Sequence, residues 1–315
     1  MVVVLALGSA LAYGLSDFVG GLVSRRASAW PVAVLAQTSS TACVTLVALL
    51  AGGAPTTGHL AWGALAGVGG GTGAAFLYRG FAAGRMGVVA PVSAVGAAVV
   101  PVLAGTLGGE RPALLVWTGI ALALPAIWLV AALPVEAVPV RAATGDAATG
   151  DAAPGDAATG DAPMDDTTRR VGRPGGWPAP ADGVADGLLA GLGFGLLFAC
   201  LGQVPDTAGW WPLALCQLVS IGAVVSLAAA LGVSWVPRGR AVRPALLAGP
   251  LGAAATGLFL LATQSGYLTV AGVLASLYPA GTVLLAAVVL HERVHRAQGL
   301  GLALCAVAVA LVVGG

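Results

Sequence analysis

Lysine is absent from this sequence of 315 residues, so all 14 of its basic side chains are arginines. A phosphate-binding P-loop and a Schiff-base enzyme both depend on a lysine, and neither can be built within this chain. ATP-driven transport would therefore need a separate subunit. The formal net charge of +1 gives no basis for binding nucleic acid. The four cysteines all fall in apolar stretches, so no disulfide framework is expected.

Charge of either sign is also scarce. Charged residues make up 9% of the chain and hydrophobic residues 58%, whereas soluble domains carry roughly 25% charged residues. About 20 apolar residues suffice for a helix that crosses a bilayer, where each backbone polar group must be paired within its own segment. We therefore predict an all-α integral membrane protein of the cell (inner, cytoplasmic) membrane. Its ten predicted transmembrane helices lie near residues 2–23, 30–51, 60–80, 86–107, 112–133, 183–203, 209–233, 244–267, 270–290 and 297–313.

The segment 134–182 differs from the rest of the chain. It repeats short Ala/Thr/Gly/Asp units, with Asp146, Asp151, Asp156 and Asp161 spaced five residues apart. Such a polar, Pro/Gly-rich segment cannot bury enough apolar surface to offset its chain entropy, so a disordered linker is predicted. The linker separates a first five-helix repeat, 1–133, from a second five-helix repeat, 183–315.

The two repeats carry the same marks in the same order. Because each repeat holds an odd number of helices, we expect the second to be inverted relative to the first, an arrangement typical of transporters with a mid-membrane site. The matching positions are Trp30-Pro31, Gln37 and Ser40 against Trp211-Pro212, Gln217 and Ser220, and Glu110-Arg111 against Glu292-Arg293, which lies 182 residues later.

Several short motifs resemble the drug/metabolite transporter superfamily and, within it, the EamA-like transporter family. They are Tyr78-Arg79-Gly80, Gly84, Pro91, Gly109-Glu110-Arg111, Ala262-Thr263-Gln264, and Leu274 to Pro279 followed by Glu292-Arg293. The resemblance covers both repeats and excludes the linker. Two positions depart from the family pattern: His291 replaces a glycine, and Ala97 stands where the second repeat has Pro279. The resemblance implies export or exchange of metabolites, amino acids or drugs, driven by an ion gradient.

Asp17 is the first candidate for the site, because the sequence places no other carboxylate well inside a predicted span. A charge at that depth costs on the order of 3 kcal/mol on insertion scales, which favours a functional role. Tyr13 lies four residues earlier on the same helix face. The resemblance implies that such a first-helix carboxylate binds a proton and a cationic solute in turn. The alternative is structural, with Asp17 paired to an arginine or reaching the interface near Arg25.

Other polar residues within the spans are candidates for lining a path for solute or protons. They are Gln37, Ser40, Tyr78, Gln217, Ser220, Gln264, Tyr267 and Tyr278. Their alternative role is to hold helices together, since polar side chains in lipid form interhelical hydrogen bonds. The predicted partners are accordingly a small solute and the lipid bilayer, and the protein is expected to be a monomer or a homodimer.

His291-Glu292-x-x-His295 matches the zinc-protease motif HExxH, in which two histidines on one helix face bind the metal. The first-repeat counterpart, Gly109-Glu110-Arg111, lacks both histidines, so we predict no metal, no cofactor and no enzymatic activity. The predicted function is secondary transport. The alternatives are a non-transporting membrane scaffold or sensor, and an intramembrane zinc protease that uses His291, Glu292 and His295.

Overall fold

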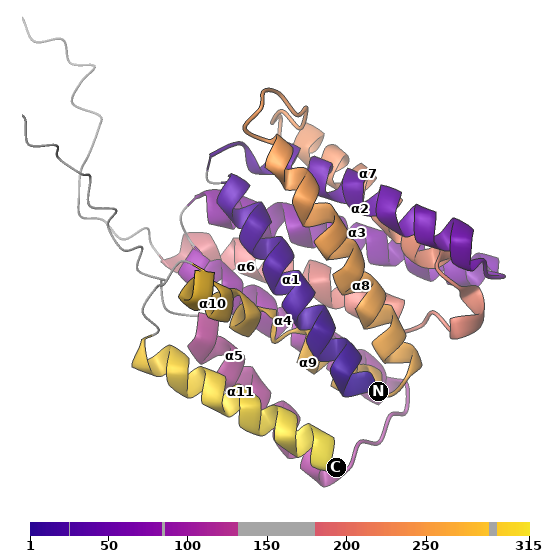
Figure 1. The fold of residues 1–315 in the computed structure, drawn as a ribbon, viewed down its shortest axis with the longest axis vertical. Coiled ribbons are helices and arrows are strands. Elements are labelled where there is room, and N and C mark those ends of the chain that lie inside the picture. The colour runs from indigo at the N-terminus through magenta and orange to yellow at the C-terminus, as the bar shows by residue number, and fades with distance from the viewer. Residues whose placement is uncertain (25, 84–85, 132–179, 290–294) are drawn as a thin grey trace, which may run out of the picture.

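The computed structural model describes residues 1–24, 26–83, 86–131, 180–289 and 295–315. All regular structure in these ranges is helical (Figure 1). The helices are α1 (Val2–Ser24), α2 (Ala29–Ala51), α3 (Thr57–Ala82), α4 (Met86–Leu107), α5 (Leu114–Ala131), α6 (Pro180–Leu201), η2 (Asp206–Ala208), α7 (Trp211–Ala230), η3 (Arg243–Leu247), α8 (Ala248–Gln264), α9 (Leu268–Ala275), α10 (Tyr278–Val289) and α11 (Arg296–Gly314). Most of the predicted linker, 134–182, lies outside the described ranges.

Within the described ranges, nine helices are long and apolar enough to cross a membrane. They correspond to nine of the ten predicted spans, and the prediction of an all-helical membrane protein is confirmed. The exception is the predicted span 270–290, which is not one helix: α9 ends at Ala275 and α10 starts at Tyr278. Pro279 explains this break, because it has no N–H to donate to Ala275 and its ring would clash with that carbonyl.

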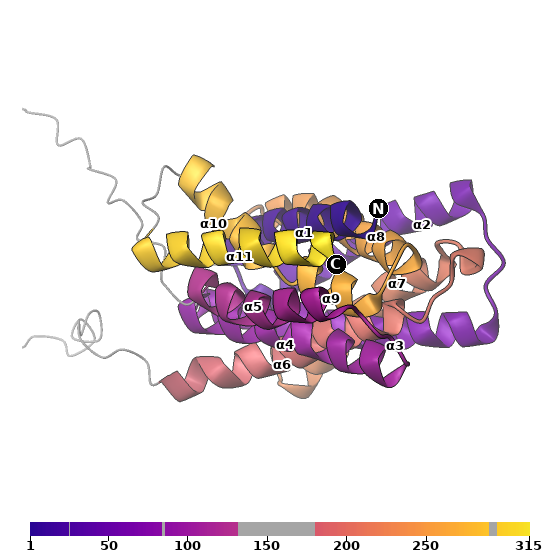
Figure 2. The ribbon, with the colours of Figure 1, turned by 90° about the horizontal axis from the view of Figure 1, so that it is seen from below.

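The two halves of the chain pack against each other more than within themselves. The most extensive helix contacts all join the first five helices to the later ones: α4 and α3 with α6, α5 with α11, α3 with α7, and α1 with α8. Figures 1 and 2 show α5 and α11 lying side by side at one edge of the bundle. The core therefore lies at the interface between the halves.

Glycines allow the closest of these helix crossings. Gly63, Gly67 and Gly71 recur at every fourth position of α3 and face α7, where a Cβ on each would run into the backbone carbonyl of Pro212, Cys216 or Ser220, respectively. Small residues at this spacing let two membrane helices approach until their backbones touch. These contacts also show that α3 and α7 run parallel, because the residue numbers of the contacting pairs rise together along both helices.

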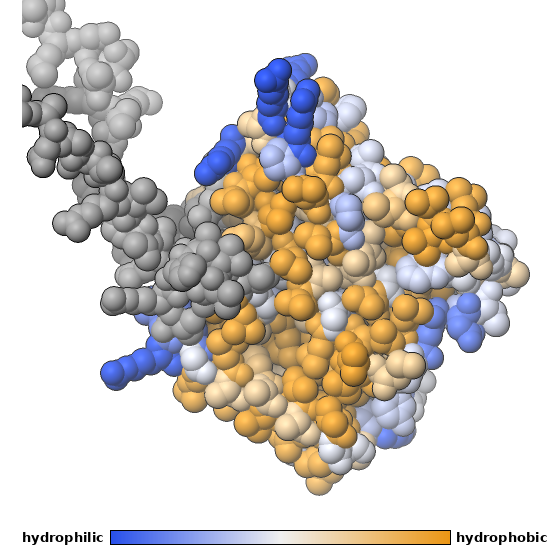
Figure 3. Space-filling model, viewed as in Figure 1, coloured by the Kyte–Doolittle hydropathy of each residue, from blue (hydrophilic) through white to orange (hydrophobic). Residues whose placement is uncertain are grey.

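The outer surface matches a membrane environment. Figure 3 shows apolar side chains over much of the visible face, with hydrophilic ones gathered toward its ends. Large apolar residues such as Leu11, Leu50 and Leu192 are at least half exposed, which is costly in water but suits contact with lipid tails. This surface and the nine apolar helices characterise a multi-pass membrane protein. Both chain termini lie at the same end of the bundle (Figures 1 and 2).

Candidate functional site

A cavity of about 60 Å³ lies between helices of both halves. Helices α1, α2 and α3 supply one part of its wall, and α6, α7 and α8 supply the other. This volume holds a few water molecules but is far below the roughly 300–1,000 Å³ of drug-sized sites. The polar residues of the wall are Tyr13, Ser16, Asp17, Gln37, Ser40, Tyr78, Gln217, Ser220 and Thr256.

Asp17 faces this cavity from α1, and only 7% of its surface is exposed. The described residues provide neither a hydrogen bond nor an ion pair to its carboxylate. The structural alternative of an arginine partner thus finds no support there: Arg26 is exposed and Arg79 pairs elsewhere. Arg25 lies outside the described residues. The arrangement leaves the carboxylate available to a proton or to a cationic group in the cavity.

Two further wall residues present buried hydroxyls that lack a partner among the described residues. Within the described part of the chain the hydroxyls of Tyr13 and Ser40 form no hydrogen bond, although the residues are only 8% and 2% exposed. A buried polar group left in this state costs roughly 1–3 kcal/mol, so a bound molecule that pairs with it gains that free energy. These hydroxyls and the Asp17 carboxylate are therefore the groups of the wall best suited to bind a polar solute.

Gln217, Ser220 and Thr256 line the second-half wall and also hold helices together. Gln217 Nε2 donates a hydrogen bond to Thr256 Oγ1 at 3.1 Å, which ties α7 to α8. Ser220 Oγ lies 2.9 Å from the Gly67 carbonyl oxygen, to which it donates across the α3–α7 crossing. The two interpretations given for these polar residues are thus compatible, because the same side chain can hold a helix and face the cavity.

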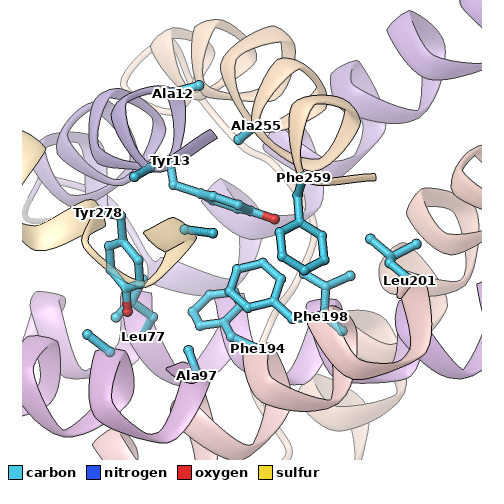
Figure 4. Packing of buried hydrophobic residues seen from close by; sticks show 14 of the residues in the cluster. Ala12, Tyr13, Leu77, Ala97, Phe194, Phe198, Leu201, Ala255, Phe259 and Tyr278 are labelled. Carbon is cyan, nitrogen blue, oxygen red and sulfur yellow. The ribbon is translucent and has the colours of Figure 1, made fainter. Parts of the chain in front are cut away.

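The remaining predicted residues are divided between the cavity and the periphery. Tyr78 is a wall residue, whereas Tyr278 lies behind the wall, 6.3 Å from Tyr13 and 6.5 Å from Phe194 between ring centroids (Figure 4). The structure does not bring the other two to the cavity. Gln264 donates to the Val204 carbonyl oxygen at 3.3 Å, and Tyr267 is 47% exposed.

The residues of the two Glu-Arg motifs lie away from the cavity where the structure describes them. Glu110 bonds to the first turn of α9, and Arg111 is exposed. Glu292, Arg293 and His291 of the HExxH match lie outside the described residues. His295 precedes the first residue of α11, where its backbone N–H donates to Gln298 Oε1 at 3.0 Å. Over the described part of the chain, no three His, Cys, Asp or Glu side chains cluster as metal ligands would.

A second buried carboxylate was missed in the sequence. Asp186 is only 1% exposed and lies within α6, which begins at Pro180, three residues before the predicted span at 183. Arg79 of α3 donates to its Oδ1 from Nε at 2.9 Å and from Nη2, and the Arg79 guanidinium lies 4.7 Å from the Phe76 ring centroid. The useful signal was an arginine at the end of span three that needed an acidic partner.

Ser16 of the cavity wall was also missed in the sequence. Its hydroxyl donates to the Ala248 carbonyl oxygen at 3.0 Å, and Ser9 donates to Ala255 at 2.8 Å. The seven-residue spacing of the two serines puts them on one face of α1. That face could have been read from the sequence as the contact with another helix.

The Arg79–Asp186 pair is expected to be energetically coupled across the two halves. In a double-mutant cycle of Arg79→Gln and Asp186→Asn, the double variant should lose less unfolding free energy than the two single variants together. We expect a coupling of about 1–2 kcal/mol, within the usual range for contacting groups. Thermal or chemical unfolding in detergent measures it, and strictly additive losses would show that the pair contributes nothing.

The geometry defines a multi-pass membrane protein with a polar, partly closed cavity between its halves. Residues 183–314 match the EamA-like transporter family, a family of membrane transporters of small solutes. The second half of the chain is therefore similar to this family, and the predicted resemblance to the drug/metabolite transporter superfamily is confirmed over these residues.

Comparison with solved structures finds a similar fold that extends over nearly the whole chain. One structure, described only as "Crystal structure of protein", matches with a TM-score of 0.62 and 17% sequence identity. The match covers 98% of this chain and 95% of that one, and at this identity it concerns the fold alone. No curated protein matches the sequence.

Proposed function

We propose that the protein is a secondary transporter of the cell (inner) membrane. It exports or exchanges a small metabolite, amino acid or drug-like solute, coupled to an ion gradient. The observation that carries this proposal is the cavity itself. It brings the Asp17 carboxylate together with the hydroxyls of Tyr13 and Ser40, none of which has a partner among the described residues, between helices of both halves.

Asp17 provides a means of coupling solute to ions. A buried carboxylate is stabilised when a proton or a cation neutralises it, and it cannot accept both at once. Binding of a cationic group at Asp17 therefore displaces a proton, and re-protonation displaces the solute. A proton gradient would then drive the solute in the opposite direction.

The contacts between halves support an inverted repeat. Helices alternate in direction, so α3 runs the same way as α1, and α8 corresponds to α3 in the second repeat. Repeats of equal orientation would make α1 and α8 parallel. They run antiparallel instead, since Ser9 bonds to Ala255 and Ser16 bonds to Ala248. The equivalent crossing of α3 and α6 is also antiparallel, with Arg79 paired to Asp186 and Gly69 beside Gly193.

Transport requires the cavity to enlarge and to open to one side at a time. Because most of the core lies between the halves, the movement that changes the cavity volume is a displacement of one half against the other. The Gly-lined crossings, where backbones already touch, are suited to act as pivots because they have few side chains to repack.

A flux screen tests the proposal. Purified protein in liposomes, supplied in turn with amino acids, amines and drug-like cations, should accumulate at least one class when a pH gradient is imposed. Without the gradient, accumulation should cease while exchange persists. A scaffold or sensor would move none of these solutes. A protease would instead contain stoichiometric zinc that is lost on His295→Ala.

Arginine placement predicts the orientation in the membrane. The loops after odd-numbered predicted spans, together with Arg79 at the end of span three, hold 13 of the 14 arginines, and the other side has only Arg111. Because arginine-rich loops stay in the cytoplasm, the linker should be cytoplasmic and both termini external. Single cysteines introduced at Thr144 and at Gly315, in a variant without the native thiols, test this with an impermeant reagent in intact cells. We expect labelling at position 315 only, and the reverse pattern would invert the assignment.

A further inference from the structure

Glu110 makes an unusual connection between the two halves. It follows α4 in the first half, yet its carboxylate accepts hydrogen bonds from two backbone N–H groups of α9 in the second half. Oε1 lies 2.6 Å from the nitrogen of Leu268, and Oε2 lies 2.9 Å from that of Thr269. The residue before the helix, Tyr267, provides no side-chain cap of its own. Glu110 therefore caps α9 from a distance of more than 150 residues in sequence.

The end of α4 is built to present this carboxylate. Gly109 has a φ of +94°, and the next residue, Glu110, donates its N–H to the Gly105 carbonyl oxygen at 3.0 Å. This is the glycine-dependent turn that commonly ends helices. The side chain then folds back over Gly105, where a Cβ would overlap the Glu110 carboxylate and approach Thr269 Cγ2 at 2.8 Å. Two glycines thus make the room that the contact with α9 requires.

Helix α9 connects this contact to the cavity. All eight of its residues are buried, so the helix is surrounded by neighbouring segments and its first turn is held by Glu110. At its other end the chain continues into Tyr278, whose ring faces those of Tyr13 and Phe194 in the cavity wall. The Tyr278 hydroxyl and Ser93 Oγ of α4 form a hydrogen bond of 2.9 Å. The segment from the start of α9 to Tyr278 is therefore held at both ends by residues of α4 or of the turn that follows it, and Tyr278 lies behind the cavity wall.

We propose that Glu110 is a positioning residue for transport: an inter-half clamp that keeps α9 seated against α4 and the cavity closed at the end of the bundle where α4 ends. Release of the clamp frees the first turn of α9 and opens that end. This inference rests on the proposed function for its purpose, but the clamp itself is measurable without any solute.

The test uses a thiol reporter on the clamped turn. Thr269 is completely buried and its hydroxyl has no partner among the described residues, so Thr269→Cys replaces it with a group of similar size. The variant is made in a background whose native thiols are replaced by alanine, namely Cys43, Cys200, Cys216 and Cys305. The rate of reaction with a water-soluble maleimide reports how often the first turn of α9 is exposed.

Two independent substitutions should release the clamp. Glu110→Gln keeps the size but removes the charge, and Gly105→Ala leaves the carboxylate intact but fills its seat. Each should raise the labelling rate at position 269 by about tenfold or more. This factor corresponds to the free energy lost when hydrogen bonds to a charged group are broken. If Glu110→Gln does not fold, Gly105→Ala still decides the question.

Matched controls separate release from general loosening. Asp206→Asn removes an exposed carboxylate that bonds only to the neighbouring Thr207 N–H, and Gly222→Ala adds a methyl group where nothing lies within 4 Å. Neither should change the rate. A reporter that keeps only Cys305, buried on α11, should also be unaffected by Glu110→Gln. An unchanged rate at position 269 in folded protein would overturn the proposal, and so would equal acceleration at Cys305. A negative flux screen would leave this result intact.

Discussion

Replacing Asp17 with asparagine is expected to reduce gradient-driven uptake to the level of protein-free liposomes. Asparagine preserves the shape of the side chain but cannot take up and release a proton. The variant should still be present in the membrane as folded protein, because the described residues offer no ion pair at Asp17 to lose. Exchange of solute in the absence of a gradient should be retained. Uptake at several values of internal and external pH, with a solute found in the flux screen, measures the effect.

The matched control for this experiment is Asp206→Asn, which removes an exposed carboxylate from the short helix η2, outside the cavity. It should transport as the unmodified protein does. Asp17→Glu, which retains the titratable group one methylene farther out, should recover part of the uptake. Normal pH-dependent transport by Asp17→Asn would rule out a coupling role for this carboxylate.

Replacing Gly67 with valine is expected to have the largest effect on stability. A Cβ at Gly67 already meets the Cys216 carbonyl oxygen and lies 2.7 Å from Val219 Cβ, so a branched side chain would force α3 and α7 apart. Overpacking of this kind costs about 3 kcal/mol when the neighbour is backbone that cannot yield. The separation would also break the bond from Ser220 Oγ to the Gly67 carbonyl oxygen.

The control is Gly222→Val in α7, at an exposed glycine where an added Cβ would have nothing within 4 Å. Both substitutions add the same side chain to a membrane helix, so propensity and hydropathy change equally. Thermal unfolding in detergent should show a lower midpoint for Gly67→Val and little change for Gly222→Val. Equal midpoints would mean that the two helices can separate without cost.

The sequence predicted the helices well because backbone N–H and C=O groups in lipid must pair within their own segment. An apolar stretch long enough to cross the bilayer is therefore a helix. It did not predict the break between α9 and α10. A proline within an apolar run is compatible with either outcome, since Pro101 and Pro125 lie inside continuous helices whereas Pro279 follows a break. The resulting eight-residue helix has an apolar sequence that gives no sign of its separate capping.

Part of the candidate site was also predictable. Asp17, Tyr13, Gln37 and Ser40 converge on one cavity because helical spacing puts each pair on one face, and the repeat extends the pattern to the second half. Partners across the halves were not predictable. The pairing of Arg79 with Asp186 and the cap from Glu110 depend on which helices cross and in what register, which neither charge nor spacing within one segment records.

The dominance of contacts between the halves has a consequence for biosynthesis. Helices α3 and α4 find their principal neighbour in α6, and α5 finds its neighbour in α11, which is translated after all the other helices described. At about 5–20 residues per second, the 182 residues after position 133 take roughly 10–40 s to translate. Until their partners in the second half are made, the glycine-lined faces of α3 and α4 meet lipid, and the contact between α5 and α11 is the last of these to form.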